Sequence, residues 1–539
     1  MAYEEPDFDD VVPRDGRVNV PSTWRHYVAP TTQSFMQTDP VKTMNAKIQT
    51  TKRDSKAVQT GKDEEQVKQS VNAVGLEGFM ASVLEMVQDE MKQVEEEHEI
   101  LEPLTRVVDG VQVPADCLHE LMPFGTDTLA RGKSSAAAAH KKLVVTCLSW
   151  SCTGQSVAAS YGRHDIPGWC EDRGVLATWN LGRDTINPTK ADVNIDVDNC
   201  LMSCAFHPEH PALIAGGTFN GDLYVWDLSQ EGDMQRAKSD ALTDLRHREP
   251  LVSIKWQYSM SEHKKYGDKT RAYRLVTLGA DGLVMVWKWH KLSVAIYGYR
   301  LLWPQPGTST KIVYGGTCMD FQVDATQSAV GGLSTFMVGS EGGRVFKCYM
   351  DMNDAALKEF AKSAAANERV ELRCPIKDAD YSQHAGAVYG LECSPFHRDL
   401  MLTCGYDGCV HLYHSLKNQH LMEVVPSAGP LYQVAWSPIR PLVFAACGHD
   451  GRVHFYDLGR VKGLVSPVLT MDASPEGKPT YSIAFNKKKP EMFATAGASG
   501  IQIWRLPANL CELRKGEEGT IRRLAAADDF EAVLRGLKR

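Results

Sequence analysis

The segment Leu431–Leu458 constrains the fold of this chain more than any other stretch of its sequence. It reads LYQVAWSPIRPLVFAACGHDGRVHFYDL and holds three short strand-like runs. The first and third runs alternate between apolar and polar residues, whereas Leu442–Cys447 is continuously apolar, so we expect two half-buried strands and one buried strand. Asp450-Gly451 is typical of the tight turn in a β-hairpin. Three strands this short cannot bury both faces alone, and the segment therefore needs neighbours of the same kind.

Six further segments repeat this pattern, and most of them close on an aromatic residue. The closing positions lie 43 to 65 residues apart, and they are Trp179, Trp226, Trp287, Cys348, Tyr413, Tyr456 and Trp504. Repeats without insertions fall near the period of roughly 40–45 residues that WD repeats show. The sequence therefore predicts an all-β fold, a seven-bladed WD40 β-propeller over residues 145–506, preceded by a disordered arm and an amphipathic helix.

The repeats differ in their turns, in their closing residues and in the insertions that they carry. The fourth, at about residues 317–350, is the weakest, because Glu341-Gly342-Gly343 replaces the Asp-Gly turn and Cys348 replaces the closing aromatic residue. Insertions interrupt the first repeat at 162–174 and the third at 258–273, and we expect a helical insertion after the fourth at 351–370.

Two segments flank the propeller. Residues 104–144 form a linker with one strand candidate, 106–114, which could complete the last blade from the N-terminal side. Residues 507–539 form a C-terminal helical tail with an amphipathic pattern, which we expect to pack on the edge of the propeller.

Residues 1–70 are polar, contain several prolines and show no sustained apolar period, which is typical of a disordered arm. Three Gln-Thr tripeptides recur in this arm, namely Met36-Gln37-Thr38, Ile48-Gln49-Thr50 and Val58-Gln59-Thr60, with Lys56 ahead of the last. Each is an extended segment that could add as a strand to the sheet edge of a partner. The alternative is a chance recurrence in a Thr- and Gln-rich tail.

Residues 71–103 carry one apolar stripe at a period of 3.6 residues, which predicts an amphipathic helix. The stripe consists of Leu76, Phe79, Met80, Val83, Leu84, Val87, Met91 and Val94. Pro103 ends the pattern. Such a face either packs on the chain's own propeller or enters a groove of a partner, and its link to the arm favours the partner.

Composition excludes several classes of function. The net charge of −8 gives no basic field for nucleic acid or a membrane surface, and there is no apolar run long enough for a transmembrane helix. The acidic start lacks the apolar stretch of a signal peptide. The 14 cysteines fall mostly in apolar runs without a CxxC pair, so we expect reduced core thiols, no zinc site and no cofactor.

The sequence also lacks a catalytic signature, since no phosphate-binding GxxxxGK[ST] loop, GxSxG elbow or HExxH pair occurs. The histidines that stand out occupy equivalent or neighbouring repeat positions, and they are His207, His397, His449 and His454. Asp281, Asp407 and Asp450 lie in turns. We therefore expect structural hydrogen bonding rather than an enzyme.

Two repeats, Cys393–Leu400 (CSPFHRDL) and Trp436–Ala446 (WSPIRPLVFAA), resemble those of dynein intermediate chains, and so does the order of arm, helix and propeller. Within that family, Tyr161–Cys170 (YGRHDIPGWC) is most similar to the intermediate chain of dynein-2, the intraflagellar-transport dynein. The Gln-Thr tripeptides resemble the recognition motif of LC8-type light chains, in which a Gln-Thr pair follows Thr, Val or Ile.

The resemblance implies a non-catalytic subunit of dynein-2 that serves retrograde intraflagellar transport and cilium assembly. Its propeller would bind the tail of a heavy chain, through residues that the sequence does not identify. LC8-type light chains would bind at Ile48, Gln49, Thr50, Lys56, Val58, Gln59 and Thr60, and more weakly at Gln37 and Thr38. A roadblock-type light chain would bind at Leu76, Phe79, Met80, Val83, Leu84, Val87 and Met91.

Other expected partners are a second, different intermediate chain, a Tctex-type light chain as a further candidate, and intraflagellar-transport trains. The expected location is the cytoplasm, the cytoskeleton, and the cilium or flagellum with its basal body. The alternatives are an intermediate chain of cytoplasmic or axonemal dynein, a generic WD40 scaffold such as a ubiquitin-ligase substrate receptor, and a propeller enzyme.

Overall fold

The computed structural model describes residues 78–79, 83–84, 115–122, 143–183, 185–240, 242–243, 245–305, 307–323, 333–351, 372–460, 465–474, 476–498, 500–527, 530 and 533. The chain divides into two compact units, Met1–Glu97 and His98–Arg539. In the first unit the described residues are all helical. None of the described helices is both long and apolar enough to cross a membrane.

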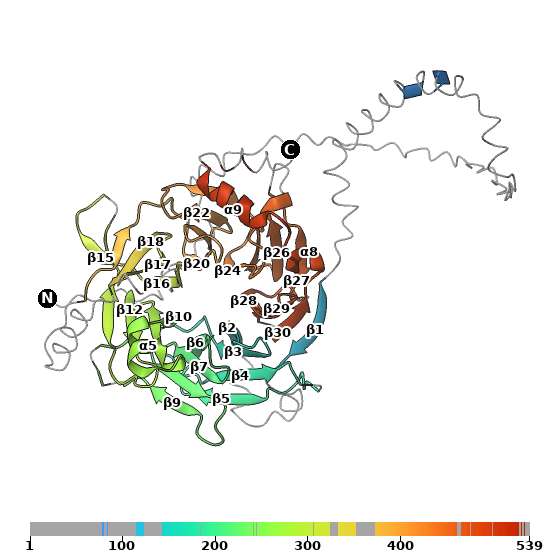
Figure 1. Cartoon of the computed structure of the whole chain (residues 1–539). Helices are drawn as coiled ribbons and strands as arrows, with labels where there is room; N and C mark the ends of the chain where they lie inside the picture. The colour runs from blue at the N-terminus through green and yellow to red at the C-terminus, as the bar shows by residue number, and fades with distance from the viewer. Residues whose placement is uncertain are drawn as a thin grey trace, which may run out of the picture. The chain divides into compact units, whose positions relative to one another are not determined.

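The second unit is a ring of seven four-stranded antiparallel sheets (Figure 1). The first three sheets are β2 (Val144–Trp150), β3 (Ser156–Gly162), β4 (Gly174–Asn180), β5 (Val193–Val197); β6 (Leu201–Phe206), β7 (Leu213–Thr218), β8 (Leu223–Asp227), β9 (Gln235–Lys238); and β10 (Leu251–Tyr258), β11 (Tyr273–Gly279), β12 (Leu283–Trp287), β13 (Tyr297–Arg300). The fourth and fifth sheets are β16 (Gly316–Phe321), β17 (Leu333–Ser340), β18 (Val345–Asp351), β19 (Ile376–Asp378); and β20 (Val388–Cys393), β21 (Leu400–Gly405), β22 (Val410–His414), β23 (His420–Val424). The sixth and seventh are β24 (Leu431–Trp436), β25 (Val443–Gly448), β26 (Arg452–Asp457), β27 (Leu469–Asp472); and β28 (Thr480–Phe485), β29 (Met492–Gly497), β30 (Gly500–Arg505) with β1 (Asp116–Leu121). The predicted seven-bladed propeller is confirmed.

The core of each sheet follows from its repeat. In each sheet the third strand of the repeat carries the closing residue. All seven closing residues are buried, and they are Trp179, Trp226, Trp287, Cys348, Tyr413, Tyr456 and Trp504. The predicted Asp-Gly turns are confirmed, since Gly282, Gly408 and Gly451 adopt φ values of 70°, 75° and 74°, a region that residues with a Cβ rarely enter.

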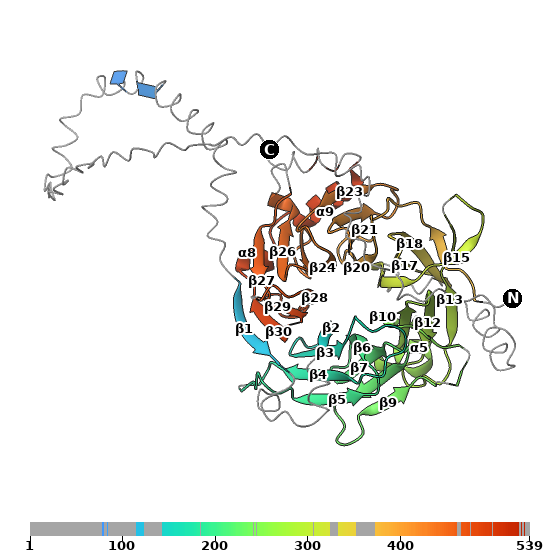
Figure 2. The same ribbon diagram turned by 180° about the vertical axis from the view of Figure 1, so that it is seen from behind.

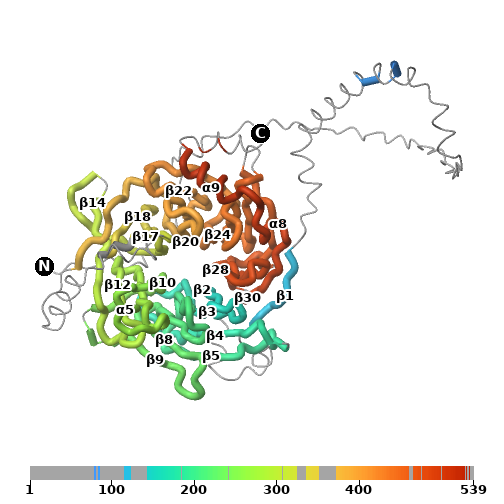
Figure 3. The backbone as a smooth tube through the Cα atoms, viewed as in Figure 1, coloured from blue at the N-terminus to red at the C-terminus, as the bar shows by residue number. Residues whose placement is uncertain are grey.

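The ring is closed by strands from both ends of the propeller sequence. Strand β1 pairs with β30 in antiparallel register, from Asp116 opposite Arg505 to Leu121 opposite Ile501, and it forms the outer edge of the seventh sheet (Figure 3). Leu121 is fully buried between this sheet and the first. The strand candidate 106–114 lies outside the described residues, and β1 begins directly beyond it.

The insertions fall within sheets. Residues between β3 and β4 form the first, and the second contains α5 (Met260–Tyr266) and η2 (Thr270–Ala272) between β10 and β11. The third insertion, at 351–370, was predicted to follow the fourth repeat, and this prediction is wrong. The insertion lies between β18 and β19, because the short strand β19 pairs with β18 and completes the fourth sheet. Residues 352–371 of that insertion lie outside the described part of the chain.

A two-stranded hairpin that the sequence did not predict joins the third and fourth sheets. It consists of β14 (Leu302–Pro304) and β15 (Lys311–Val313). Trp303 packs with its ring centroid 6.5 Å from that of Phe346, and Tyr314 packs at 5.2 Å from the same ring. The hairpin thus brings aromatic side chains to the sheet whose closing residue is Cys348.

The C-terminal segment packs on the outside of the ring. After η3 (Leu458–Arg460) and the seventh sheet come α8 (Ala508–Cys511) and α9 (Glu517–Ala526). Helix α9 lies beside the fifth and sixth sheets (Figure 2). Its residues Ile521, Leu524 and Ala525 are buried in one apolar cluster with these sheets. This packing covers the side of the ring with an amphipathic helix.

Candidate functional site

Most of the predicted light-chain residues lie outside the described residues. These are Gln37, Thr38, Ile48, Gln49, Thr50, Lys56, Val58, Gln59, Thr60, Leu76, Met80, Val87 and Met91. The remaining three, Phe79, Val83 and Leu84, are helical. Phe79 and Leu84 expose 61% and 55% of their surface, so a partner that covers them would remove a large apolar area from water. Light-chain binding by these residues stays a prediction.

Histidine and aspartate side chains hold the third sheet together in a chain of hydrogen bonds. His247 Nδ1 lies 3.2 Å from Asp281 Oδ1, and His247 Nε2 lies 2.9 Å from Thr277 Oγ1. The indole of Trp287 donates to the same Thr277 oxygen at 2.9 Å. The chain links the loop before the sheet, the β11–β12 turn and the closing residue.

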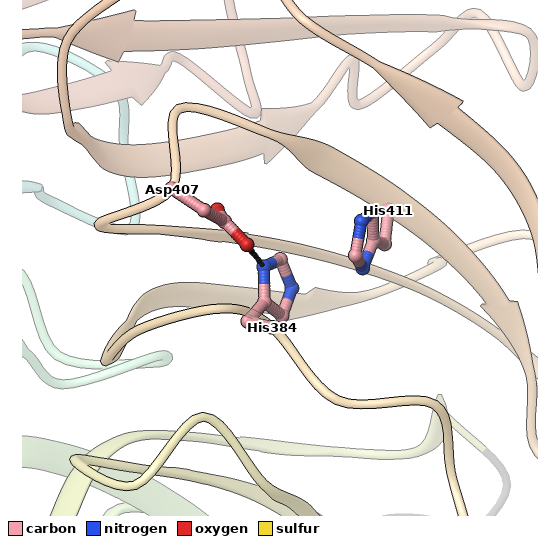
Figure 4. A group of neighbouring side chains, drawn as sticks. All are labelled: His384, Asp407 and His411. Atoms are coloured by element: carbon pink, nitrogen blue, oxygen red, sulfur yellow. Dashed lines mark hydrogen bonds and ion pairs between the residues drawn. The ribbon is translucent and has the colours of Figure 1, made fainter. Parts of the chain in front are cut away.

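The fifth sheet repeats this chain. His384 Nδ1 lies 2.9 Å from Asp407 Oδ2 (Figure 4). His384 Nε2 lies 2.7 Å from Thr403 Oγ1. Burial raises the pKa of Asp407, but the hydrogen bond and charge of His384 outweigh it and lower the pKa to about 2. Both ring nitrogens of His384 are occupied, which indicates a structural role. The interpretation of Asp281 and Asp407 as turn residues is confirmed, since each also accepts a backbone N–H two residues on.

The other predicted histidines also make local hydrogen bonds. His207 is fully buried, and its Nδ1 accepts the backbone N–H groups of Glu209 and His210 at 3.1 and 3.0 Å. Its Nε2 lies 3.1 Å from the carbonyl of Thr270 in η2. Burial lowers the pKa of His207 to about 4. This histidine therefore joins the second sheet to the insertion of the third.

A tyrosine rim, defined as Tyr389, Tyr432 and Tyr481, forms the candidate binding surface. Each residue lies at the bulge in the first strand of its sheet, where the pairing register skips one residue. The centroid of Tyr432 lies 5.8 Å from that of Tyr389 and 5.0 Å from that of Tyr481. A bulge redirects a side chain away from the regular ladder. Three neighbouring sheets thus place their phenol rings side by side, each at the bulge in its first strand.

The rim belongs to one arc of the propeller. The first strands of successive sheets lie side by side around the ring, and β28 lies beside β2. The corresponding bulge residues of the first four sheets are Thr146, Met202, Val252 and Thr317. Tyr406, in the turn that follows β21 of the fifth sheet, is 60% exposed. Tyrosine is enriched where protein surfaces bind one another, because it has a large apolar ring and a polar tip.

Sequence reasoning missed this surface, although a signal was present. The first strands of the last three repeats read VYGLEC, LYQVAW and TYSIAF, with tyrosine at the second position of each. The position is recognisable only after the repeats are aligned, and its meaning depends on the ring that makes the three residues neighbours.

The turn between β24 and β25, which carries the PIRP sequence, is tied to the C-terminal helices. Arg440 is fully buried. Its Nη2 lies 2.8 Å from Asp457 Oδ2, and its Nη1 donates to the carbonyl of Asn509 in α8. A buried guanidinium requires partners of this kind.

Two side-chain groups in the fifth sheet could hold a metal ion: His384, Asp407 and His411, and Cys409, His411 and Glu423. In the first, His384 and Asp407 already take part in the structural hydrogen-bond chain. The second lies on β22, β23 and the turn before β22.

Comparison with known proteins agrees with the fold. The family model "WD domain, G-beta repeat" matches residues 377–414, which include the first three strands of the fifth sheet and end before β23. "Cytoplasmic dynein 2 intermediate chain 2" of Mus musculus is 32% identical over 426 residues, which are 75% of this chain and 72% of the relative. The protein of the same name from Homo sapiens is 33% identical over 51% of this chain and 49% of the relative.

A more distant match is "Dynein axonemal intermediate chain 1" of Rattus norvegicus, 23% identical over 51% of this chain and 34% of the relative. The resemblance seen in the sequence is therefore confirmed. The chain belongs to the dynein intermediate chain family, within which it is similar to intermediate chain 2 of cytoplasmic dynein 2.

Proposed function

We propose that this protein is the non-catalytic intermediate chain of the dynein-2 motor, acting in retrograde intraflagellar transport and cilium assembly. The observation that carries the proposal is the 32% identity to a cytoplasmic dynein 2 intermediate chain over three quarters of this chain. Axonemal relatives match at lower identity and over a shorter span. The propeller acts as a platform and the N-terminal arm as a scaffold for light chains.

The propeller would bind the tail of the heavy chain through the tyrosine rim. The rim places three aromatic side chains side by side, as in the aromatic centres that dominate binding energy in protein interfaces. Its partial exposure means that a partner can cover the rings without unfolding the sheets.

The test is co-purification of the full-length chain with a tail segment of a dynein-2 heavy chain. Tyr432→Ala together with Tyr481→Ala should weaken binding by more than about tenfold, because truncating an interface hot spot costs about 2 kcal/mol or more. Met202→Ala together with Val252→Ala is the matched control, since these residues occupy the same bulge position in other sheets. Equal binding of both double variants would exclude the rim, and no binding by the unaltered chain would exclude the heavy-chain assignment.

The arm would bind LC8-type light chains at the segments around Gln49 and Gln59, and a roadblock-type light chain through Phe79 and Leu84. Tandem sites that face a dimeric light chain gain affinity through effective concentration. In the full-length chain, Gln49→Ala with Gln59→Ala should abolish LC8-type capture, whereas Gln37→Ala should have little effect. Phe79→Asp with Leu84→Asp should abolish roadblock-type capture while the thermal unfolding of the propeller is unchanged.

A second, different intermediate chain would lie beside this one, held by the shared light chains, with a Tctex-type chain as a further candidate. The alternative is an intermediate chain of cytoplasmic or axonemal dynein, and the weaker axonemal match supports its axonemal form. Localisation of the tagged protein distinguishes them. Movement with trains along the ciliary shaft and staining at the basal body support dynein-2, whereas fixed staining of doublets or a purely cell-body distribution contradicts it.

A further inference from the structure

The outer half of the fifth sheet brings together a thiol, imidazoles and a carboxylate. Cys409 precedes β22 and His411 lies two residues further on, so both side chains point to the same face of the sheet. Glu423 in β23 is the direct cross-strand partner of His411. The ligand atoms of these three residues all lie within 4.8 Å of one another.

The distances around Glu423 match the edges of a metal coordination sphere. Cys409 Sγ lies 3.4 Å from Glu423 Oε1, and His411 Nε2 lies 3.9 Å from Oε2. In a tetrahedral zinc site, Zn–S bonds of about 2.3 Å and Zn–N or Zn–O bonds of about 2.0 Å place neighbouring ligand atoms roughly 3.3–3.6 Å apart. The 3.9 Å separation is too long for a hydrogen bond. A small shift of the half-exposed Glu423 side chain would complete the geometry.

Hydrogen bonds on the far side of His411 direct its lone pair toward Glu423. The hydroxyl of Tyr413 donates to the carbonyl of Ser382 at 2.7 Å, so it has no second proton to give. His411 Nδ1 lies 2.9 Å from this hydroxyl oxygen and must therefore carry the hydrogen. The other nitrogen, Nε2, then faces a carboxylate with a lone pair, an arrangement of two acceptors that a cation between them would stabilise.

The fold does not require these three residues. The third sheet contains the same chain of histidine, aspartate and threonine, with His247, Asp281 and Thr277. At the positions that correspond to Cys409, His411 and Glu423 it has Leu283, Met285 and Gly298. Cys409, His411 and Glu423 are therefore not needed for the hydrogen-bond chain of histidine, aspartate and threonine that the third and fifth sheets share.

We propose that Cys409, His411 and Glu423 form a zinc site that joins β22 to β23, with water as the fourth ligand. A thiolate and a carboxylate with a neutral imidazole balance the charge of one divalent ion, and this mixture of ligands suits zinc better than calcium or magnesium. His420, whose ring stacks on that of His411 at 4.6 Å, lies beside the site and has its Nε2 3.6 Å from Glu423. The ion enters from the exposed side of Glu423. The sequence missed the site because its ligands come from two strands and form no CxxC motif.

The test measures zinc in the full-length chain after equilibration with zinc chloride and dialysis against a competing chelator. The wild-type chain should retain one more equivalent of zinc than the variant Cys409→Ser with Glu423→Gln. Cys152→Ser is the matched thiol control, because this cysteine is also partly exposed and lies in the turn between β2 and β3, and it should retain the wild-type amount. Equal zinc in wild type and the double variant would overturn the proposal.

Cobalt supplies a second measurement that does not depend on background zinc. Cobalt bound to the wild-type chain should show a thiolate-to-cobalt charge-transfer band, which Cys409→Ser should remove and Glu423→Gln should shift. Near-isosteric changes keep the sheet folded, and circular dichroism with thermal unfolding of the metal-free proteins checks this. A band that persists in Cys409→Ser would assign the metal to another thiol and contradict the site.

Discussion

Arg440 Nε lies 3.1 Å from Glu517 Oε1, a contact between the β24–β25 turn and the first residue of helix α9. Both side chains are buried, with exposed fractions of 0% and 7%. Because Asp457 receives a further hydrogen bond from the same guanidinium, one side chain joins the sixth sheet to the C-terminal helices.

Replacement of Arg440 by Ala should therefore destabilise the propeller strongly. The change leaves the carboxylates of Asp457 and Glu517 buried without their main partner, and breaking a buried pair in this way costs about 3–5 kcal/mol. Urea unfolding of the full-length chain measures the loss. Arg452→Ala is the control, because its ion pair with Asp472 is largely exposed and should cost less than about 1 kcal/mol. Similar losses for the two variants would contradict the role of Arg440.

Removal of the closing strand should open the ring. A chain that begins at residue 123 lacks β1, which leaves the edge of β30 unpaired and removes the fully buried Leu121. We expect a lower thermal midpoint and concentration-dependent aggregation, because an unpaired strand edge recruits other strands. A chain that begins at residue 98 lacks only the first compact unit and should unfold like the full-length protein. Light scattering during thermal unfolding distinguishes these outcomes.

Loss of stability in mild acid should depend on His207. Its folded-state pKa of about 4 lies below the ordinary value of 6.5. The unfolded chain therefore binds the proton first, and the stability that His207 contributes is full above pH 6.5 and lost as the pH falls toward 4. The difference corresponds to about 3 kcal/mol. Unfolding free energies measured between pH 7 and pH 4 check this expectation.

The matched variant is His207→Asn. In the seventh sheet, Asn486 occupies the corresponding place and accepts the N–H groups of Lys488 and Lys489, each at 3.0 Å. Asparagine at position 207 should thus keep the turn while removing the titrating group. The stability of the variant should fall less steeply between pH 6.5 and pH 4. Parallel curves for the two proteins would show that His207 does not cause the acid sensitivity.

The repeat pattern was sufficient to predict the ring, because buried strands and Asp-Gly turns leave strong local signals. The sequence signal of strand β1 was weaker. As an edge strand it buries only Leu121 fully, and its other residues resemble those of a linker. The three-residue strand β19 has no apolar period, which explains why the insertion at 351–370 was assigned to the wrong side of it.

The contacts that define the candidate sites were harder to predict, because they join distant parts of the sequence. Nothing in the local pattern pairs Arg440 with Glu517, and the tyrosine rim exists only where three first strands meet. Cys409 and Glu423 become neighbours through the register of β22 and β23. The spacing of residues along the chain does not indicate which of them face one another across two paired strands.

The pairing of β1 with β30 also sets the order of events during synthesis of the protein. The ribosome completes β1 early, and its partner β30 emerges only after almost all of the propeller has been made. At about 5–20 residues per second, this interval is roughly 20–80 s. Throughout it, the nascent chain is an open arc whose first-made strand has no partner. Because an unpaired strand edge recruits other strands, the newly made chain is most open to mispairing during this interval.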